Sequence, residues 1–477
     1  MSNASADTHT SPRLSPWDGI SIIIGIVIGV SIFETPPMIY SNVAGPLWVA
    51  VVWVAGGLLS LIGALCYAEL TTTYPQSGGD YVYLKRAYGN WVGFLFGWAQ
   101  LVAILTGSIG AMAYVFANYA ARLWSLPASS HAWLAAGVVT VIAIVNLGGV
   151  VVEKTVQNLL TIAKLLGVAC IAVAGLVWGG HASLDPASAA GDGGIGMAMI
   201  FVLYSYGGWN DAAFVASEVR NRQRNLPRVL LIGTGSIMII YLLVNAGYLW
   251  GLGFEKVRHS SAPAADVLHN ALGDWASTGM SVLVMISALG AVNGMIYTGS
   301  RVYASLGTDH RVFAVLGRWH PRWNVPVWSI LLPAAVSVCM IFAVGTDQGK
   351  TLLDHVMTGI GLPALPWKEY FGGFSTLVSG TAPVFWLFFL LTGISVFVLR
   401  IRDRNTPRIF SVPLFPLTPI VFCLTCIFML YSSLNYAKYL SLLGIVPLLA
   451  GLPLYFLSRR TSVDSEPSPI SPAAEET

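Results

Sequence analysis

Charged residues are scarce in this chain of 477 residues. Only 10% are Asp, Glu, Lys or Arg, whereas a globular protein carries about a quarter. Hydrophobic residues make up 55%, and the mean hydropathy is +0.70. So few charges cannot cover a water-facing surface, so most of the chain must face lipid or itself. The composition therefore excludes a soluble protein and predicts an integral membrane protein in a lipid bilayer.

Cysteine and net charge are also low, and each excludes a class of protein. The five cysteines lie inside apolar runs, so they indicate neither a disulfide framework nor a metal site, although Cys423 and Cys426 have metal-binding spacing. A net charge of +3 gives no sign of a nucleic-acid partner. Residues 1–16 lack the basic and apolar regions of a cleaved signal peptide. The apolar runs carry no nucleophile–histidine set, so we expect neither an enzyme nor a cofactor.

Long apolar runs are what the sequence does contain. Twelve are long enough to cross a hydrocarbon core of about 30 Å, and they are too long for the strands of a lipid-facing barrel. The sequence thus predicts an all-α integral membrane protein with about twelve transmembrane helices. The expected spans are 17–41, 47–67, 91–119, 132–151, 156–178, 196–217, 228–251, 277–304, 326–345, 376–399, 414–434 and 440–457.

The Lys and Arg residues orient these spans. With the N-terminus in the cytoplasm, 18 of the 25 lie in cytoplasmic segments and 6 in outer ones, while Lys164 lies within a span. The positive-inside rule requires a bias of this sign. We therefore expect a multi-pass protein of the cell (plasma or inner) membrane, with both termini cytoplasmic. A polar N-terminus, 1–16, and a disordered tail, 458–477, would flank a twelve-helix domain, 17–457.

Two spans are interrupted at matching places. The first contains Gly29, Ser31 and the pair Pro36–Pro37, and the sixth contains adjacent glycines within 206–211. Such residues leave backbone groups unpaired, which lipid tolerates only around an internal cavity or another protein surface. Because these spans begin two five-helix halves of opposite direction, the matching breaks predict a transport site at the bilayer midplane. Ordinary helix kinks are the alternative.

The residue types at these breaks suit an amino acid. Thr35 before Pro36 has the pattern of a helix N-cap, so we expect an outer half-helix to begin there. Asn210 or Asp211 would cap the inner half of the sixth helix likewise. Two half-helix N-termini suit a carboxylate, and the free carbonyls where the first helix ends near Gly29 suit an ammonium. A zwitterion with both groups on one carbon satisfies this pair, which predicts an α-amino acid substrate.

Several motifs form a set that is more specific than any one of them. They are Ile28-Gly29-Val30-Ser31-Ile32-Phe33, Tyr67-Ala68-Glu69-Leu70, Pro75-x-Ser77-Gly78-Gly79-x-Tyr81-x-Tyr83, Tyr204-Ser205-Tyr206-Gly207-Gly208-Trp209-Asn210, Arg224-Asn225-Leu226-Pro227, and Asn293-Gly294 with Ser300-Arg301. This set resembles the amino acid–polyamine–organocation superfamily, most closely its L-type amino-acid transporter branch. The resemblance implies a LeuT-type fold of two inverted five-helix repeats, about 17–178 and 196–399, plus two peripheral helices in about 414–457.

The resemblance also implies where the substrate binds. The backbone of both breaks would hold the substrate α-groups, with Tyr204 resembling the family's extracellular gate and Trp209 packing beside the pocket. Ser31 stands where the family usually has a second glycine. The implied residues are Gly29, Val30, Ser31, Ile32, Phe33, Tyr204, Ser205, Tyr206, Gly207, Gly208, Trp209 and Asn210. Tyr297, Phe385 and Trp386 are further candidates for a side-chain pocket, or else core aromatics.

Three charged residues border the expected site. Lys164 costs about 2.5–3.5 kcal/mol inside a span, and similar lysines in the family lie beside the first-helix break, where sodium-coupled relatives bind sodium. We interpret Lys164 as a coupling residue, the alternative being a lysine that snorkels to the nearby cytoplasmic surface. Asp211 is as readily a helix cap as a ligand. Glu34 either contacts a substrate amine or lines the outer vestibule.

Together these features predict a transporter that moves L-amino acids by alternating access. Transport would be independent of sodium, as proton symport or exchange through Lys164. A polyamine or organic-cation carrier, suggested by Glu34 and Asp211, and a non-transporting amino-acid sensor are the alternatives. Segment 120–131 has no cysteine, whereas heteromeric animal members use one there, so we expect no disulfide-linked heavy chain.

Overall fold

The chain is described by a computed structural model over most of its length. The described residues are 15–76, 78–148, 150–179, 194–210, 219–260, 262–321, 323, 325–365, 367 and 372–458. Every regular element in these ranges is a helix, which confirms the expected all-α fold class. The predicted polar N-terminus up to residue 14 and the predicted tail from residue 459 lie outside the described residues.

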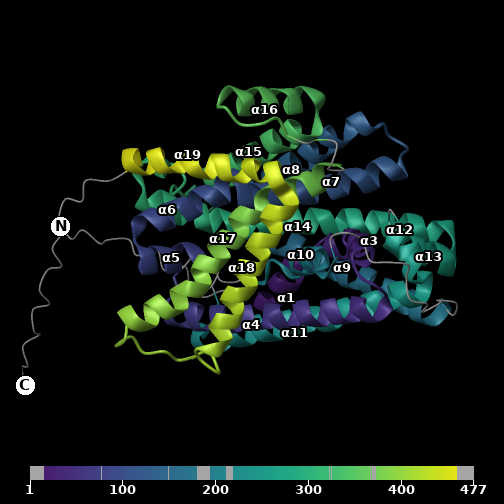
Figure 1. Cartoon of the computed structure of the whole chain (residues 1–477), viewed down its shortest axis with the longest axis horizontal. Coiled ribbons are helices and arrows are strands. Elements are labelled where there is room, and N and C mark those ends of the chain that lie inside the picture. The colour runs from purple at the N-terminus through teal and green to yellow at the C-terminus, as the bar shows by residue number, and fades with distance from the viewer. Residues whose placement is uncertain are drawn as a thin grey trace, which may run out of the picture.

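The helices follow the predicted spans in order (Figure 1). The first span is divided into α1 (Pro16–Val27), α2 (Ser31–Glu34) and α3 (Pro36–Ser41). The rest of the first half consists of α4 (Pro46–Thr73), α5 (Asp80–Tyr88), α6 (Asn90–Ala99), the π-helix η1 (Gln100–Ile104), α7 (Leu105–Leu123), the short 3-10 helix η2 (Ala128–Ser130), α8 (His131–Leu147) and α9 (Val150–Trp178).

The second half begins with the helix of the other predicted break. It consists of α10 (Gly194–Tyr206), α11 (Arg222–Leu252), α12 (Phe254–His259), α13 (Pro263–Leu272), α14 (Asp274–Asp309), η5 (Arg311–Phe313), α15 (Val327–Gly345), α16 (Asp347–Gly359), α17 (Gly372–Arg402), α18 (Leu417–Ala437), η7 (Lys438–Ser441) and α19 (Leu442–Ser458). The predicted outer loops 252–276 and 346–375 thus contain the short helices α12, α13 and α16.

Eight helical stretches in the described part are long and apolar enough to cross a membrane. The last of them, Leu417–Ser458, holds the two final predicted spans, and the shorter apolar stretches Lys164–Trp178 and Gly194–Tyr206 correspond to the fifth and sixth. The first span is too fragmented to count. Several helices outrun the prediction, as α4 does by ending at Thr73, because hydropathy counts only apolar residues while polar turns continue the helix.

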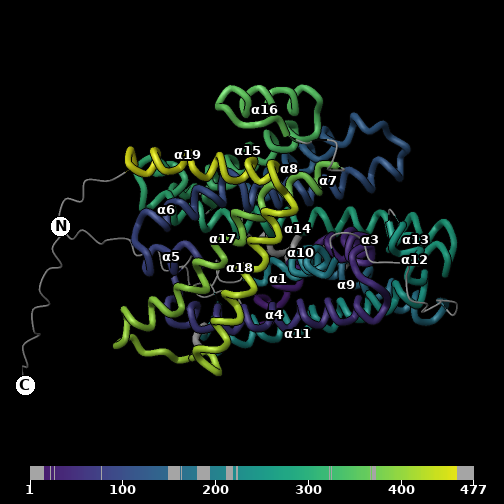
Figure 2. Tube along the Cα trace, viewed as in Figure 1, coloured from purple at the N-terminus to yellow at the C-terminus, as the bar shows by residue number. Residues whose placement is uncertain are grey.

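Helices of the two halves pack against one another in matching pairs. α4 packs on α11, α7 on α14 and α8 on α15, and Figures 1 and 2 show α4 and α11 running side by side. α9 contacts α11 and α14, while α17 contacts α4 and α7, which is the same relation with the halves exchanged. Inverted repeats produce this kind of pairing. The repeat boundaries themselves stay a prediction.

The last two long helices lie at the edge of this arrangement. α18 packs on α17 and α4, and α19 packs on α17 and α6. Only 22% of their most apolar window is buried. Large apolar side chains of α18, such as Leu424, Ile427 and Phe428, are exposed. In an integral membrane protein such side chains face lipid, so the molecule is embedded in the bilayer on this side as well.

Candidate substrate site

The first break frees backbone groups near the middle of the protein. α1 ends at Val27, residues 28–30 are not helical, and α2 begins at Ser31. The Gly29 amide donates to the Val27 carbonyl at 2.6 Å and so does not pair with the Gly25 carbonyl four residues back. Among the described residues, the amides of Ser31 and Ile32 have no hydrogen-bond acceptor. These two amides form the positive end of the outer half-helix.

The second break is built on glycines. α10 ends at Tyr206, and the Gly207 amide donates to the Tyr204 carbonyl at 3.0 Å. Gly208 has a φ of +103°, which side chains with a Cβ rarely adopt, so the turn requires glycine there. Asn210 follows in a short turn. Asp211 lies outside the described residues, so its role as a cap or ligand stays a prediction.

Thr35 stands at the N-cap position of α3, which begins at Pro36 as predicted, but its side chain makes no cap, and the prediction that the outer half-helix starts there was wrong. The half-helix begins four residues earlier, because the amides of Phe33 and Glu34 already pair with the Val30 carbonyl. Thr35 itself has helical φ and ψ and makes no side-chain cap. Its hydroxyl lies 2.8 Å from the Ser31 carbonyl and 2.8 Å from the Ser205 hydroxyl. Thr35 therefore joins the first broken helix to the sixth.

Tyrosines of α11 pair with carbonyls at both breaks. The Tyr241 hydroxyl lies 2.7 Å from the Val27 carbonyl and 3.0 Å from the Ser205 carbonyl. The Tyr248 hydroxyl donates to the Ile32 carbonyl at 3.2 Å. Sequence reasoning missed these residues, because a tyrosine in an apolar run gives no sign of the helix it will face.

A cavity of about 120 Å³ lies between the two breaks. This is several times the space that one water needs, so it suits a small ligand. No Asp, Glu, Lys or Arg is among the described residues that line it. The breaks contribute Gly29, Ser31, Gly207, Gly208 and Asn210, and the helices around them contribute Val27, Gln100, Ile104, Leu105, Ser108, Met112, Ile200, Leu203, Tyr204, Met295, Val378, Thr381, Ala382, Phe385 and Trp386.

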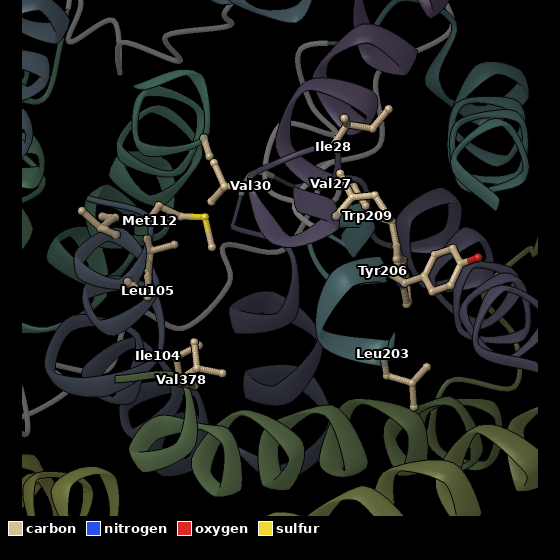
Figure 3. Packing of buried hydrophobic residues seen from close by; sticks show 14 of the residues in the cluster. Val27, Ile28, Val30, Ile104, Leu105, Met112, Leu203, Tyr206, Trp209 and Val378 are labelled. Carbon is tan, nitrogen blue, oxygen red and sulfur yellow. The ribbon is translucent and has the colours of Figure 1, made fainter. Parts of the chain in front are cut away.

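The apolar part of the wall comes from two sides. Figure 3 shows Ile104, Leu105 and Met112 on one side, with Val27 and Leu203 across from them. Three neutral polar side chains, Gln100, Ser108 and Thr381, were not predicted. Gln100 opens the π-helix η1 and is 6% exposed. A buried amide in an apolar run was the one signal for it, whereas the π-helix itself has no sequence signature.

The predicted substrate-binding residues divide into two groups. Gly29, Ser31, Tyr204, Gly207, Gly208 and Asn210 line the cavity. The other six are buried beside it without lining it: Val30, Ile32, Phe33, Ser205, Tyr206 and Trp209. Tyr206 points away from the cavity (Figure 3), and its hydroxyl donates to the Trp53 carbonyl at 3.0 Å. Trp209 packs edge-on against Tyr67, with ring centroids 5.1 Å apart, and lines a smaller neighbouring cavity.

The candidate aromatic residues also separate. Phe385 and Trp386 are neighbours on α17, and both line the cavity; their rings meet edge to face, with centroids 5.1 Å apart. Tyr297 does not line it, because the Arg301 guanidinium covers its ring at 3.6 Å from the centroid. Only α17 therefore supplies the large aromatic wall of the cavity among these candidates.

Lys164 is fully buried and lies against the first break. Its ammonium donates to the Gly25 carbonyl, the same group that the break leaves without its helical partner. A snorkelling side chain would reach the surface, so the complete burial contradicts that alternative. The lysine compensates the unwinding of α1, since it pairs with a backbone carbonyl released by the break. Its role in coupling stays a prediction.

Glu34 lies away from the cavity. It is on α2, is partly exposed, and is not among the residues that line the cavity. Because α2 also contacts α13 from the predicted outer loop, Glu34 fits the outer vestibule better than the substrate pocket. Its function remains a prediction.

Comparison with known proteins identifies the family. The model of the amino acid permease family matches residues 14–447, which is most of the chain. A relative from Oryctolagus cuniculus, the large neutral amino acids transporter small subunit 2, is 30% identical over 449 residues, covering 91% of this chain and 78% of that protein. These matches confirm the resemblance to the superfamily and its L-type branch.

Two other relatives are similar over comparable lengths. The human b(0,+)-type amino acid transporter 1 is 29% identical over 94% of this chain and 88% of its own. The serine/threonine exchanger SteT of Bacillus subtilis (strain 168) is 28% identical over 92% of this chain and 94% of its own. These relatives are transporters and not enzymes. This chain is a helical membrane protein with two broken helices around a small cavity, and the family model matches most of its length. It therefore belongs to the amino acid permease family.

Proposed function

We propose that this permease carries neutral L-amino acids across the membrane by alternating access. The observation that carries the proposal is the cavity between the two breaks, which is lined by backbone of both and by no charged side chain among the described residues. Backbone at a midplane break binds the groups that all α-amino acids share, and the neutral wall selects uncharged side chains.

The α-groups of the substrate would bind at opposite ends of the half-helices. The free amides of Ser31 and Ile32 at the start of α2 suit the carboxylate, with the Ser31 hydroxyl beside them. The carbonyl-bearing ends of α1 and α10 suit the ammonium. The side chain would then extend toward Met112, Phe385 and the other apolar residues of the wall. This arrangement explains recognition without an ion pair.

Coupling would depend on Lys164 rather than on sodium. The buried ammonium supplies a positive charge beside the first break, where a metal ion would otherwise neutralise released carbonyls. Transport would therefore be proton symport or exchange, without sodium.

Alternating access would involve the whole repeat arrangement. The paired packing of the halves supports inverted repeats at about 17–178 and 196–399, with peripheral helices in 414–457. The Lys and Arg bias supports cytoplasmic termini in a plasma or inner membrane. Since segment 120–131 has no cysteine, the protein would work without a disulfide-linked heavy chain.

Uptake into proteoliposomes tests this proposal. The purified protein is assayed with radiolabelled leucine, serine, arginine and putrescine under a proton gradient, a sodium gradient, or internal amino acid. We expect saturable uptake of the neutral amino acids without sodium. Uptake confined to putrescine would favour an organic-cation carrier that uses Glu34 and Asp211. Sodium dependence would contradict the role of Lys164, and binding without flux would indicate a sensor.

A further inference from the structure

Asp80 is a buried carboxyl group in the connection between the second and third spans. It is the first residue of α5 and is 2% exposed. Its Oδ1 accepts a hydrogen bond from the Tyr67 hydroxyl of α4, and the Thr392 hydroxyl of α17 donates to the same oxygen at 2.8 Å. The carboxyl group also accepts a hydrogen bond from the Asn210 side chain. One side chain thus joins three segments that are distant in sequence.

The contact with Asn210 connects Asp80 to the substrate cavity. Asn210 belongs to the sixth-helix break and lines the substrate cavity. The cluster beneath it contains Trp209, which packs on Tyr67 at 5.1 Å between ring centroids and on Phe389 at 5.9 Å. α5 belongs to a connection that the Lys and Arg bias places on the cytoplasmic side. Asp80 therefore lies between the cavity and the cytoplasm.

The chemistry of the cluster suits a contact that breaks and re-forms. Among the described residues, no Lys or Arg forms an ion pair with Asp80, and its partners are neutral hydroxyl and amide donors. Burial raises the pKa of this carboxyl to about 6. Hydrogen bonds alone therefore hold the Asp80 carboxyl group in place. Losing one of them can shift the balance between two conformations of the protein, and it leaves no buried positive charge without a partner.

We propose that Asp80 is a positioning residue of the transport cycle: its carboxyl group holds Asn210 against α4 and α17, and this contact keeps the substrate cavity closed toward the cytoplasm. The proposal rests on the transport function proposed above. Opening to the cytoplasm requires Asn210 to leave Asp80, so occupation of the cavity and closure of the inner side are linked through one side chain.

The test compares two carboxyl groups that hold α5 in place, Asp80 at its start and Asp309 of α14. Asp80→Asn replaces one carboxylate oxygen with an NH2 donor, so a single acceptor oxygen remains for the three donors Tyr67, Thr392 and Asn210. Asp309→Asn is the matched control, because Asp309 accepts from Tyr81 and Lys85 of α5, both at 2.6 Å, without an observed bond to the break. Both changes are made in a protein whose five cysteines are replaced by alanine and which carries Ala382→Cys in the cavity wall.

Labelling of this cysteine by a membrane-impermeant thiol reagent is measured from the cytoplasmic side, in inside-out vesicles. Since a hydrogen bond to a charged group is worth a factor of about ten or more, we expect roughly tenfold faster labelling in Asp80→Asn. The Asp309→Asn protein should label at the parental rate. Equal rates in the Asp80→Asn and parental proteins would overturn the proposal, as would an equal increase in both variants.

A second variant and a kinetic measurement keep the proposal testable if the Asp80→Asn protein fails to fold. Thr392→Val removes one donor to Asp80 and leaves the charge in place, so it should also speed labelling, by a smaller factor. For transport, we expect Asp80→Asn to change the maximal rate more than the KM, because Asp80 does not touch the cavity. Unchanged labelling in Thr392→Val together with misfolded Asp80→Asn would count against the contact. Labelling needs no substrate. If the protein transports no amino acid, the proposed function is refuted, while the labelling rates still test the contact between Asp80 and Asn210.

Discussion

Individual residues at the two breaks supply hydrogen bonds that the interrupted helices lack. Lys164 pairs with the Gly25 carbonyl, Tyr241 lies on carbonyls of both breaks, and Thr35 links Ser31 to Ser205. Each interaction satisfies a backbone or hydroxyl group that has no water at this depth. The site is therefore as much a set of backbone partners as a set of substrate ligands.

Replacing Lys164 by methionine should separate transport from stability. Lys164→Met removes the cost of burying an ammonium and leaves the Gly25 carbonyl unpaired, so these effects on the free energy of unfolding oppose each other. Transport should fall about tenfold or more, since a hydrogen bond from a charged group contributes roughly 1.5–3 kcal/mol. Initial uptake rates and apparent melting temperatures in detergent measure both. Unchanged proton-driven uptake would contradict a coupling role.

A second residue-scale prediction concerns Gly208. Gly208→Ala places a Cβ on a backbone with φ +103°, which costs about 1–2 kcal/mol. We expect a lower apparent melting temperature and weaker substrate binding, because the turn lines the cavity. Gly196→Ala in α10, the helix before this turn, is the control, since a Cβ there meets no atom nearer than one of Phe428 at 3.6 Å. If both variants melt alike, the conformation of Gly208 is not what the turn requires.

At the scale of elements, ion pairs at the predicted cytoplasmic end tie helices together. Glu69 near the end of α4 accepts from Arg400 of α17 at 2.7 and 2.5 Å and from the Val412 amide at 2.7 Å. A second pair joins α5 to the end of α17, where the Arg86 guanidinium holds the pKa of Asp403 below its usual value. α17 is thus linked to both α4 and α5 beyond the cavity.

Neutralising Glu69 should weaken the link between α4 and α17. Glu69→Gln leaves Arg400 without its buried partner, and breaking such a pair costs about 3 kcal/mol. Asp266→Asn is the control, because its pair with Arg122 is exposed and 3.8 Å long, and such pairs contribute about 0–1 kcal/mol. Apparent melting temperatures should fall clearly for Glu69→Gln and barely for Asp266→Asn. A small effect in both would show that the pair between Glu69 and Arg400 does not stabilise the fold.

At the scale of the whole molecule, the charge asymmetry predicts one orientation. In the cysteine-free protein, Ser129→Cys in segment 120–131 and Asn405→Cys after α17 are both exposed. Because 18 of the 25 Lys and Arg lie in the predicted cytoplasmic segments, an impermeant thiol reagent added to intact cells should label only the first. Labelling of the second instead would invert the topology, and with it the side on which Asp80 acts.

How much the sequence predicted depends on the length scale of the signal. Spans were predictable because a bilayer demands about 20 apolar residues, and both breaks were visible as Gly and Pro in matching helices. The start of the outer half-helix was misplaced at Thr35, since a capping pattern competes with backbone pairing that only the folded chain reveals. Gln100, Ser108 and Thr381 were missed, because a wall residue is defined by the helix opposite it.

By itself, the sequence determined the class of the protein, its all-α architecture and the location of the two breaks. These follow from composition and local backbone chemistry, which act within one helix. Only the tertiary structure decided which faces of the helices meet. It turned Tyr206 away from the cavity, brought Lys164 onto the Gly25 carbonyl and joined Asp80 to Asn210. Such contacts span more than a hundred residues, and packing, rather than any local pattern, selects them.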